Sequence, residues 1–229
     1  MACVFDAKSQ SIYDDLNPMT VSHTCTGTNR LLVLSLIVKG DIARTGGAPT
    51  YAGVEMTQIG TPLAATESNV EMWYLPNPAS GANTLSVPNT GTILMRLIAS
   101  SYTGALQSGT LDIYGDVTGT TANPSKLITT GGAGEAIVDA MGNGLATAET
   151  GRSHTLLYAN DEGTWNDAAQ YTIQTSAGDI TFSHTIAADD WALRVASFKQ
   201  YVASITDSQP AYTGGHGGIT DSQPAYAAG

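Results

Sequence analysis

The stretch Leu32-Val33-Leu34-Ser35-Leu36-Ile37-Val38 decides the fold, because nearly every position in it is apolar. A strand with one wet face alternates apolar and polar residues, whereas a continuously apolar run indicates a strand that is covered on both faces. We therefore predict a central strand of the hydrophobic core at this position.

Similar short runs occur along the whole chain, separated by clusters of Gly, Pro, Asn and Asp. Such spacing is typical of strands joined by turns, and segments with a helical period are almost absent. The pattern predicts an all-β fold of two packed antiparallel sheets. The strands are expected at residues 4–7, 20–26, 30–39, 54–59, 70–75, 84–87, 93–103, 127–130, 136–140, 155–159, 171–175, 180–185 and 191–201.

The last of these runs shows the alternation that the first lacks. Trp191, Leu193 and Val195 share one face, and Arg194 lies on the other, as in a strand with one wetter side. We predict that it is the last strand of a single sandwich formed by residues 1–202. Residues 203–229 then form a glycine-rich, extended C-terminal tail.

Charge excludes two classes of partner. The chain has 229 residues, with 20 acidic against nine basic side chains, and a net charge of −11. This charge repels phosphate backbones and anionic lipid, so we expect neither nucleic acid nor membrane as a partner. Residues 1–6 lack a basic start and an apolar segment, so the sequence predicts no signal peptide and assembly in a host cytoplasm.

The two cysteines are predicted to be small buried hydrophobic residues. Cys3 and Cys25 both lie in or beside candidate strands and could pair if those strands were neighbours. A reducing cytoplasm disfavours the disulfide, and no metal-ligand spacing is present.

No motif with a strong catalytic mechanism occurs in the chain, and we predict no enzyme, no cofactor and no metal. Three of the four histidines, His23, His154 and His184, lie in the tripeptide Ser-His-Thr, and we expect hydrogen-bonded packing roles for them. The glycines at 131–134 and 142–144 fit tight turns better than a phosphate-binding loop.

Acidic and aromatic side chains leave two weaker alternatives. Calcium could be held by carboxylates, with residues 160–163 as the best candidate, but turn residues explain the same letters. The tryptophans are too widely separated in sequence to indicate a sugar-stacking platform. The acidic clusters are Asp14 with Asp15, Asp161 with Glu162 and Asp167, and Asp189 with Asp190; the tryptophans are Trp73, Trp165 and Trp191.

The tail contains the octapeptide Ile-Thr-Asp-Ser-Gln-Pro-Ala-Tyr twice, at residues 205–212 and 219–226. Two equal peptides on a spacer suit two equal grooves, because the second binding event becomes intramolecular. The alternative is a duplication without a role. We predict a bivalent docking strap in which Ile and Asp extend a sheet edge, Pro ends the pairing and Tyr anchors in an apolar pocket. The docking residues are Ile205, Asp207, Pro210, Tyr212, Ile219, Asp221, Pro224 and Tyr226.

Four segments carry a resemblance to a known group of proteins. They are residues 22–33 (SHTCTGTNRLLV), 51–57 (YAGVEMT), 72–87 (MWYLPNPASGANTLSV) and 191–198 (WALRVASF). Together they resemble jelly-roll-like β-sandwich proteins of bacteriophage virions and bacterial surface or display contexts. The resemblance spans about residues 3–200 and leaves the tail outside. It implies a jelly-roll-like fold and a structural role, and it supplies no catalytic residues.

These observations predict a non-enzymatic virion protein, in the first place a phage capsid decoration or cement protein. Its partners would be a capsid or other virion protein, or copies of itself in a homo-oligomer. The alternatives are a subunit of a tail fibre, spike or extracellular filament, and a carbohydrate-binding adhesin.

Overall fold

The protein is antiparallel β-structure throughout the part of the chain that the computed structural model describes, which is residues 1–12, 14–40, 43–90, 93–144, 149–160 and 166–203. Those residues contain no helix that is long and apolar enough to cross a membrane. The predicted all-β antiparallel sandwich is confirmed, and its described strands form four sheets where two were expected.

The N-terminal half of the chain builds two of these sheets. Its five-stranded sheet has the order β1-β9-β3-β7-β6, and its smaller sheet has the order β2-β8-β4-β5. The strands are β1 (Val4–Gln10), β2 (Met19–Cys25), β3 (Leu31–Lys39), β4 (Thr50–Tyr51), β5 (Val54–Glu55), β6 (Thr57–Ala64), β7 (Ser68–Pro76), β8 (Gly81–Val87) and β9 (Met95–Thr103).

The C-terminal half builds the other two. Its five-stranded sheet has the order β10-β17-β12-β15-β14, and its smaller sheet has the order β11-β16-β13. The strands are β10 (Leu111–Gly119), β11 (Ser125–Thr130), β12 (Ala136–Asn143), β13 (Gly151–Arg152), β14 (Thr155–Ala159), β15 (Asn166–Ile173), β16 (Gly178–Thr185) and β17 (Trp191–Phe198).

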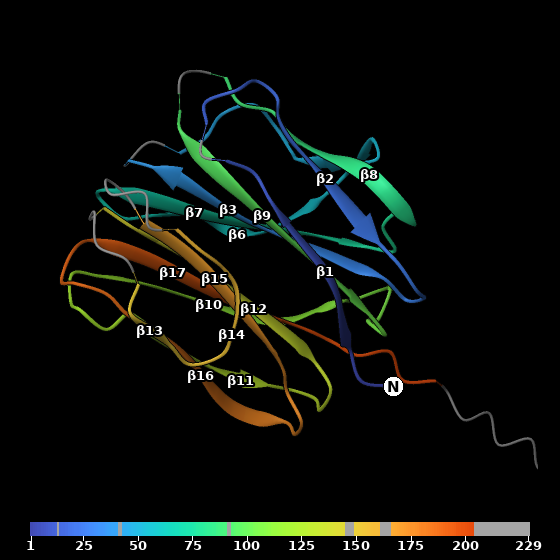
Figure 1. Ribbon diagram of the computed structural model, residues 1–229. Coiled ribbons are helices and arrows are strands. Elements are labelled where there is room, and N and C mark those ends of the chain that lie inside the picture. The colour runs from blue at the N-terminus through green and yellow to red at the C-terminus, as the bar shows by residue number, and fades with distance from the viewer. Residues whose placement is uncertain (13, 41–42, 91–92, 145–148, 161–165, 204–229) are drawn as a thin grey trace, which may run out of the picture.

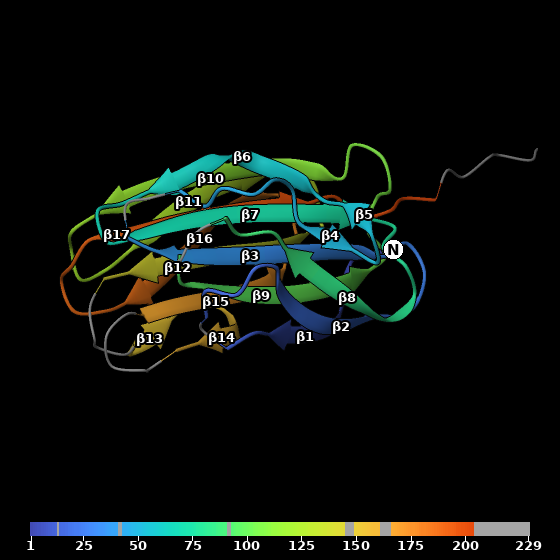
Figure 2. The same cartoon turned by 90° about the horizontal axis from the view of Figure 1, so that it is seen from above.

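The four sheets are stacked as layers. Figure 1 shows the two five-stranded sheets face to face in the middle, with the sheet of β2 and β8 on one outer side and the sheet of β11 and β16 on the other. Figure 2, seen from above, shows the long strands of both central sheets running along the same direction of the molecule. Antiparallel sheets aligned in this way bury their apolar faces between the layers.

The two halves repeat one strand plan. The order β1-β9-β3-β7-β6 corresponds strand by strand to the order β10-β17-β12-β15-β14, so that β1 matches β10, β9 matches β17, β3 matches β12, β7 matches β15 and β6 matches β14. In the smaller sheets, β2 matches β11 and β8 matches β16. Registers match as well: Leu31 pairs with Tyr102 in one half, as Ala136 pairs with Phe198 in the other.

An irregularity in the first strand of each half supports the match. The register of β1 skips Asp6 between Phe5 and Ala7, and the register of β10 skips Asp112 between Leu111 and Ile113. A β-bulge of this kind turns the extra residue out of the ladder. In each half the carboxylate accepts the backbone N–H of the residue that follows the second strand, at 2.8 Å for Asp6 and 2.7 Å for Asp112.

Three apolar layers fill the spaces between the four sheets. Many of the residues that the C-terminal half contributes to the middle layer are alanines, which lets the central sheets approach closely. A Cβ at Gly142 would lie 2.7 Å from Cγ2 of Ile37. The residues of the N-terminal half include Leu31, Val33, Ile37 and Met72, and the alanines are Ala136, Ala140, Ala169, Ala192 and Ala196.

The central strand predicted at Leu32–Val38 is confirmed, since β3 lies in the middle of its sheet with Val33 and Ile37 in the middle layer and Leu34 and Leu36 in the outer one. The prediction of a wetter side for the last strand was wrong, because every residue of β17 is buried. Arg194 is fully buried and binds Asp116 at 2.6 Å, so a charged residue in a strand did not signal solvent here.

The cysteines behave as predicted. Cys3 lies in the middle apolar layer and Cys25 in the outer layer of the N-terminal half, and both thiols are free and buried. Burial raises the pKa of Cys3 to about 11, so its thiol is protonated at neutral pH.

Candidate functional site at the chain termini

The beginning and the end of the described chain meet at one end of the molecule. The amino group of Met1 donates to the carbonyl of Tyr201 at 2.9 Å, and the N–H of Tyr201 donates to the carbonyl of Gly104 at 2.7 Å. The N–H of Leu106 donates to the carbonyl of Lys199 at 2.8 Å. Residues 199–203, which we name the exit segment because residues 204–229 follow it, are therefore held between the N-terminus and the link joining the two halves.

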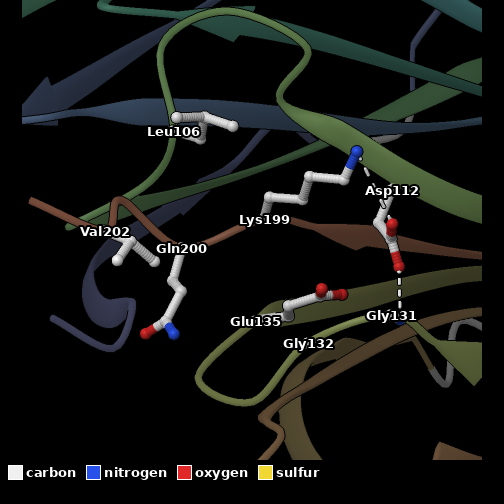
Figure 3. A pocket seen from close by; sticks show the side chains of 8 residues that line it. All are labelled: Leu106, Asp112, Gly131, Gly132, Glu135, Lys199, Gln200 and Val202. Carbon is white, nitrogen blue, oxygen red and sulfur yellow. Dashed lines mark hydrogen bonds and ion pairs between the residues drawn. The ribbon is translucent and has the colours of Figure 1, made fainter. Parts of the chain in front are cut away.

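A pocket of about 340 Å³ lies on one side of the exit segment. Figure 3 shows side chains converging on it from the start of β10, the turn before β12 and the exit segment. Leu106 and Val202 supply apolar contacts, and Val202 is 66% exposed. We call this the carboxyl pocket, and it is lined by Leu106, Asp112, Gly131, Gly132, Glu135, Lys199, Gln200 and Val202.

Two carboxyl groups share the floor of the carboxyl pocket. Asp112 accepts the N–H of Gly131 at 2.7 Å and lies 3.7 Å from Nζ of Lys199. Glu135 accepts the hydroxyl of Ser197 at 2.5 Å. Burial raises the pKa of Glu135, and the nearby Asp112 carboxyl adds to the rise. The oxygens of both carboxyl groups can accept hydrogen bonds from a bound polar group.

The glycines of the same turn leave room for these carboxyl groups. A Cβ at Gly132 would lie 2.8 Å from Oε1 of Glu135, and one at Gly131 would lie 3.2 Å from both Asp112 oxygens. Gly134 has a φ of 73°, which favours glycine. The predicted turn role of residues 131–134 agrees with this geometry, and the turn also forms a wall of the pocket.

A second pocket, of about 320 Å³, lies on the other side of the exit segment. It has no carboxylate among its lining residues, and Thr28, Asn29 and Thr103 provide its polar groups. We call it the amide pocket, and it is lined by Met1, Gly27, Thr28, Asn29, Thr103, Gly104, Tyr201 and Ala203.

The predicted docking residues of the two octapeptides all lie outside the described residues, as do Trp165, Asp161 and Glu162. Of the other acidic residues, Asp167 is buried and bonded at 2.8 Å to Arg96, which also lies over the ring of Tyr158. Asp167 therefore serves packing between layers. No group of three or more His, Cys, Asp or Glu side chains suited to a metal ion occurs in the part of the chain that the structure describes.

The histidines of the three Ser-His-Thr tripeptides have different partners. His23 bonds Ser9 at 2.9 Å, and burial lowers its pKa to about 4. His154 bonds the carbonyl of Thr181 at 3.0 Å. These contacts match the predicted hydrogen-bonded packing roles.

His184 has a stronger environment than the sequence indicated. Its Nε2 lies 2.7 Å from Asp139 and its Nδ1 lies 2.5 Å from Glu149, and Gln170 completes the network at Asp139. Burial lowers the pKa of His184, but the two carboxylates outweigh it and raise that pKa to about 9. With both ring nitrogens bonded to carboxylates, the imidazolium joins β16 to β12 and has no free nitrogen for proton transfer.

The remaining tryptophans are core residues. Trp73 donates its indole N–H to Glu71 at 2.9 Å, and Trp191 donates its own to the carbonyl of Thr121 at 2.8 Å.

The strongest candidate for a binding site is therefore the end of the molecule with its two pockets. Comparison of the chain with protein-family models, with curated proteins and with solved structures gives no match in any of the three.

Proposed function

We propose that this protein is a non-enzymatic structural subunit of a virion, of the capsid decoration or cement type, whose C-terminal repeats dock on the shell or on a neighbouring subunit. The observation that supports it best is the placement of the repeats. The two identical octapeptides follow an exit segment that backbone hydrogen bonds hold at one end of the body, and the first of them begins two residues after that segment.

The body suits such a role because its layers are joined by more than apolar packing. Lys8 donates to the carbonyl of Leu157 at 2.8 Å, Ser35 donates to the carbonyl of Asp139 at 3.0 Å, and Arg194 donates to the carbonyl of Thr61 at 2.6 Å. Each of these bonds joins the N-terminal half to the C-terminal half. Because these bonds hold the two halves together, the body itself should lose little further conformational entropy when an attached peptide binds a partner.

If the proposal holds, a phage genome encodes the chain, and cosedimentation with purified virions of that phage tests it. The full chain should pellet with the particles saturably. A variant with glycine and serine in place of residues 205–212 and 219–226 should bind at least a hundredfold more weakly. His216→Ala, which changes only the spacer between the repeats, is the control and should bind as the full chain does.

Bivalent docking makes a further demand on the same assay. Replacing a single octapeptide should weaken apparent binding by about a hundredfold or more, because linked sites gain roughly 10²–10⁴ in avidity. Equal pelleting of the chain with and without both octapeptides would show that the tail is not the docking element.

A further inference from the structure

The two pockets occupy equivalent places in the two halves. Registers match Thr103 with Lys199, since each lies one residue beyond the partner of Leu31 or Ala136. By the same matching, Gly104 is the counterpart of Gln200, and Gly27 is the counterpart of Gly132. Each half thus forms a pocket between the turn after its second strand and the residues after its last strand.

The exit segment forms the ridge between these pockets. Its side chains alternate, so that Gln200 and Val202 line the carboxyl pocket while Tyr201 and Ala203 line the amide pocket. The described chain therefore ends on this segment, with one pocket on either side of it.

Three apolar side chains at this end are exposed. Met1 is 85% exposed, Val202 66% and Tyr201 38%, and each lines one of the pockets. Adjoining exposed apolar groups of this kind indicate a binding surface. Their polar neighbours, Glu135 in one pocket and Asn29 in the other, can bond a phenolic hydroxyl or an amide.

The occupant follows from number, chemistry and reach. There are two matched pockets and two identical octapeptides, each ending in Tyr, whose apolar ring and polar tip suit a pocket with both kinds of wall. Tyr212 lies nine positions beyond Ala203, a stretch of about 30 Å when extended, which allows the chain to turn back into either pocket. The spacer, residues 213–218, spans about 14 Å on average, enough to bridge two sites on either side of one extended segment.

We propose that the carboxyl pocket and the amide pocket are the docking sites of the tail's own octapeptides, one in each, with Tyr212 and Tyr226 as the anchoring side chains. Docking within the chain is favoured over a second copy, because the tethered peptide has an effective concentration in the millimolar range. The inference rests on the proposed function in taking the octapeptides as docking elements. It adds that, in an isolated subunit, the octapeptides occupy the subunit's own two pockets until the partner draws them out.

Nuclear magnetic resonance of the isolated full chain tests the pockets. Tyr212→Ala with Tyr226→Ala should shift the backbone amide signals of Gly132 and Gln200 in one pocket and of Thr28 and Gly104 in the other. The signal of Leu127, on an outer sheet, should stay in place. His216→Ala is the matched control and should leave all four pocket signals where they are. Unchanged pocket signals in the double variant would overturn the proposal.

The synthetic octapeptide Ile-Thr-Asp-Ser-Gln-Pro-Ala-Tyr serves as the probe for specificity. Added to the double variant at millimolar concentration, it should move the pocket signals back towards their wild-type positions. The same peptide with Ala in place of Tyr should not. Equal effects of both peptides would contradict anchoring by tyrosine.

Dilution separates docking within a chain from docking between chains. The pocket signals of the wild-type chain should stay constant over a hundredfold dilution. Signals that return to the double-variant positions on dilution would show that a second copy is the occupant and would overturn docking within the chain. Because no virions are present in these experiments, their failure is distinct from a failure of the cosedimentation assay, which tests the proposed function.

Discussion

Equivalent residues of the two halves meet different chemistry. Asp6 and Asp112 occupy the same bulge, but Arg30 stands in the N-terminal half where Glu135 stands in the other. Burial alone would raise the pKa of Asp6, but hydrogen bonds from Thr26 and Ser101 lower it overall. At Glu135 the second carboxyl instead adds to the effect of burial. Neighbouring groups therefore set the direction of the pKa shift at each of these two carboxyl groups.

Glu135→Gln should stabilise the protein at neutral pH. Because the pKa of Glu135 is raised in the folded state, its ionisation opposes folding, and wild-type stability falls as pH rises above the unfolded carboxyl pKa. Glutamine keeps an acceptor for Ser197 without the charge. We expect a higher melting temperature than wild type at pH 7 and no gain below pH ~4, where the carboxyl is protonated in both states. Thermal denaturation at both pH values checks this, and a gain that persists in acid would point to a cause other than ionisation.

At the scale of elements, the network around His184 shows how an outer strand is fixed to a central one. The registers place Leu34, Trp73 and Val87 of the N-terminal half where Asp139, Gln170 and His184 stand in the other. The first set packs as apolar core, whereas the second is joined by hydrogen bonds and ion pairs. The same layer contact is thus built by two different chemistries.

Stability should fall on the alkaline side because of His184. Its pKa is about 9 in the fold against an ordinary 6.5, so its contribution is complete below pH 6.5 and is lost as pH rises through about 9. The difference corresponds to roughly 3 kcal/mol, or about 10 °C in melting temperature. Thermal melts between pH 6.5 and 8.5 should show most of this fall, and they stay below the range in which the raised pKa of Cys3 adds an alkaline loss of its own.

Two variants identify the group responsible for the alkaline fall. His184→Val should melt lower at pH 6.5, since it leaves Asp139 and Glu149 buried without their cation, and it should lose the alkaline slope. His23→Gln is the control, because the pKa of His23 is about 4 and the residue stays neutral across this range. An alkaline slope that survives in His184→Val would assign the titration to another group.

The strands most accessible to prediction were those buried on both faces. The prediction for residues 30–39 differs by one residue from β3, and the prediction for residues 93–103 by two from β9. Strand β10 was missed, because Asp112, Gly115 and Asp116 within it read as turn residues. Asp112 lies at the bulge, and Asp116 pairs with Arg194. Neither feature can be recognised from the sequence without knowing which strands are neighbours.

The strand plan that the two halves share is only weakly visible in the amino-acid sequence. Identical residues lie 97 positions apart in five pairs within β7, β8, β15 and β16. They are Asn69 and Asn166, Tyr74 and Tyr171, Gly81 and Gly178, Thr84 and Thr181, and Ser86 and Ser183. A comparison of the chain with itself at this spacing would reveal it. The pockets need the fold, since the sequence alone does not bring Met1, Gly27 and Tyr201 together.

The middle apolar layer should make the two halves unfold as one unit. Its residues come from both five-stranded sheets, so loss of either half exposes the buried face of the other. Leu85→Ala and Phe182→Ala create cavities at matched positions in the two outer layers, at a cost of about 2–5 kcal/mol each. Scanning calorimetry should show a single transition in each variant, lower by roughly 5–15 °C. Two halves that folded independently would instead give two transitions in each variant, one of them at the wild-type temperature.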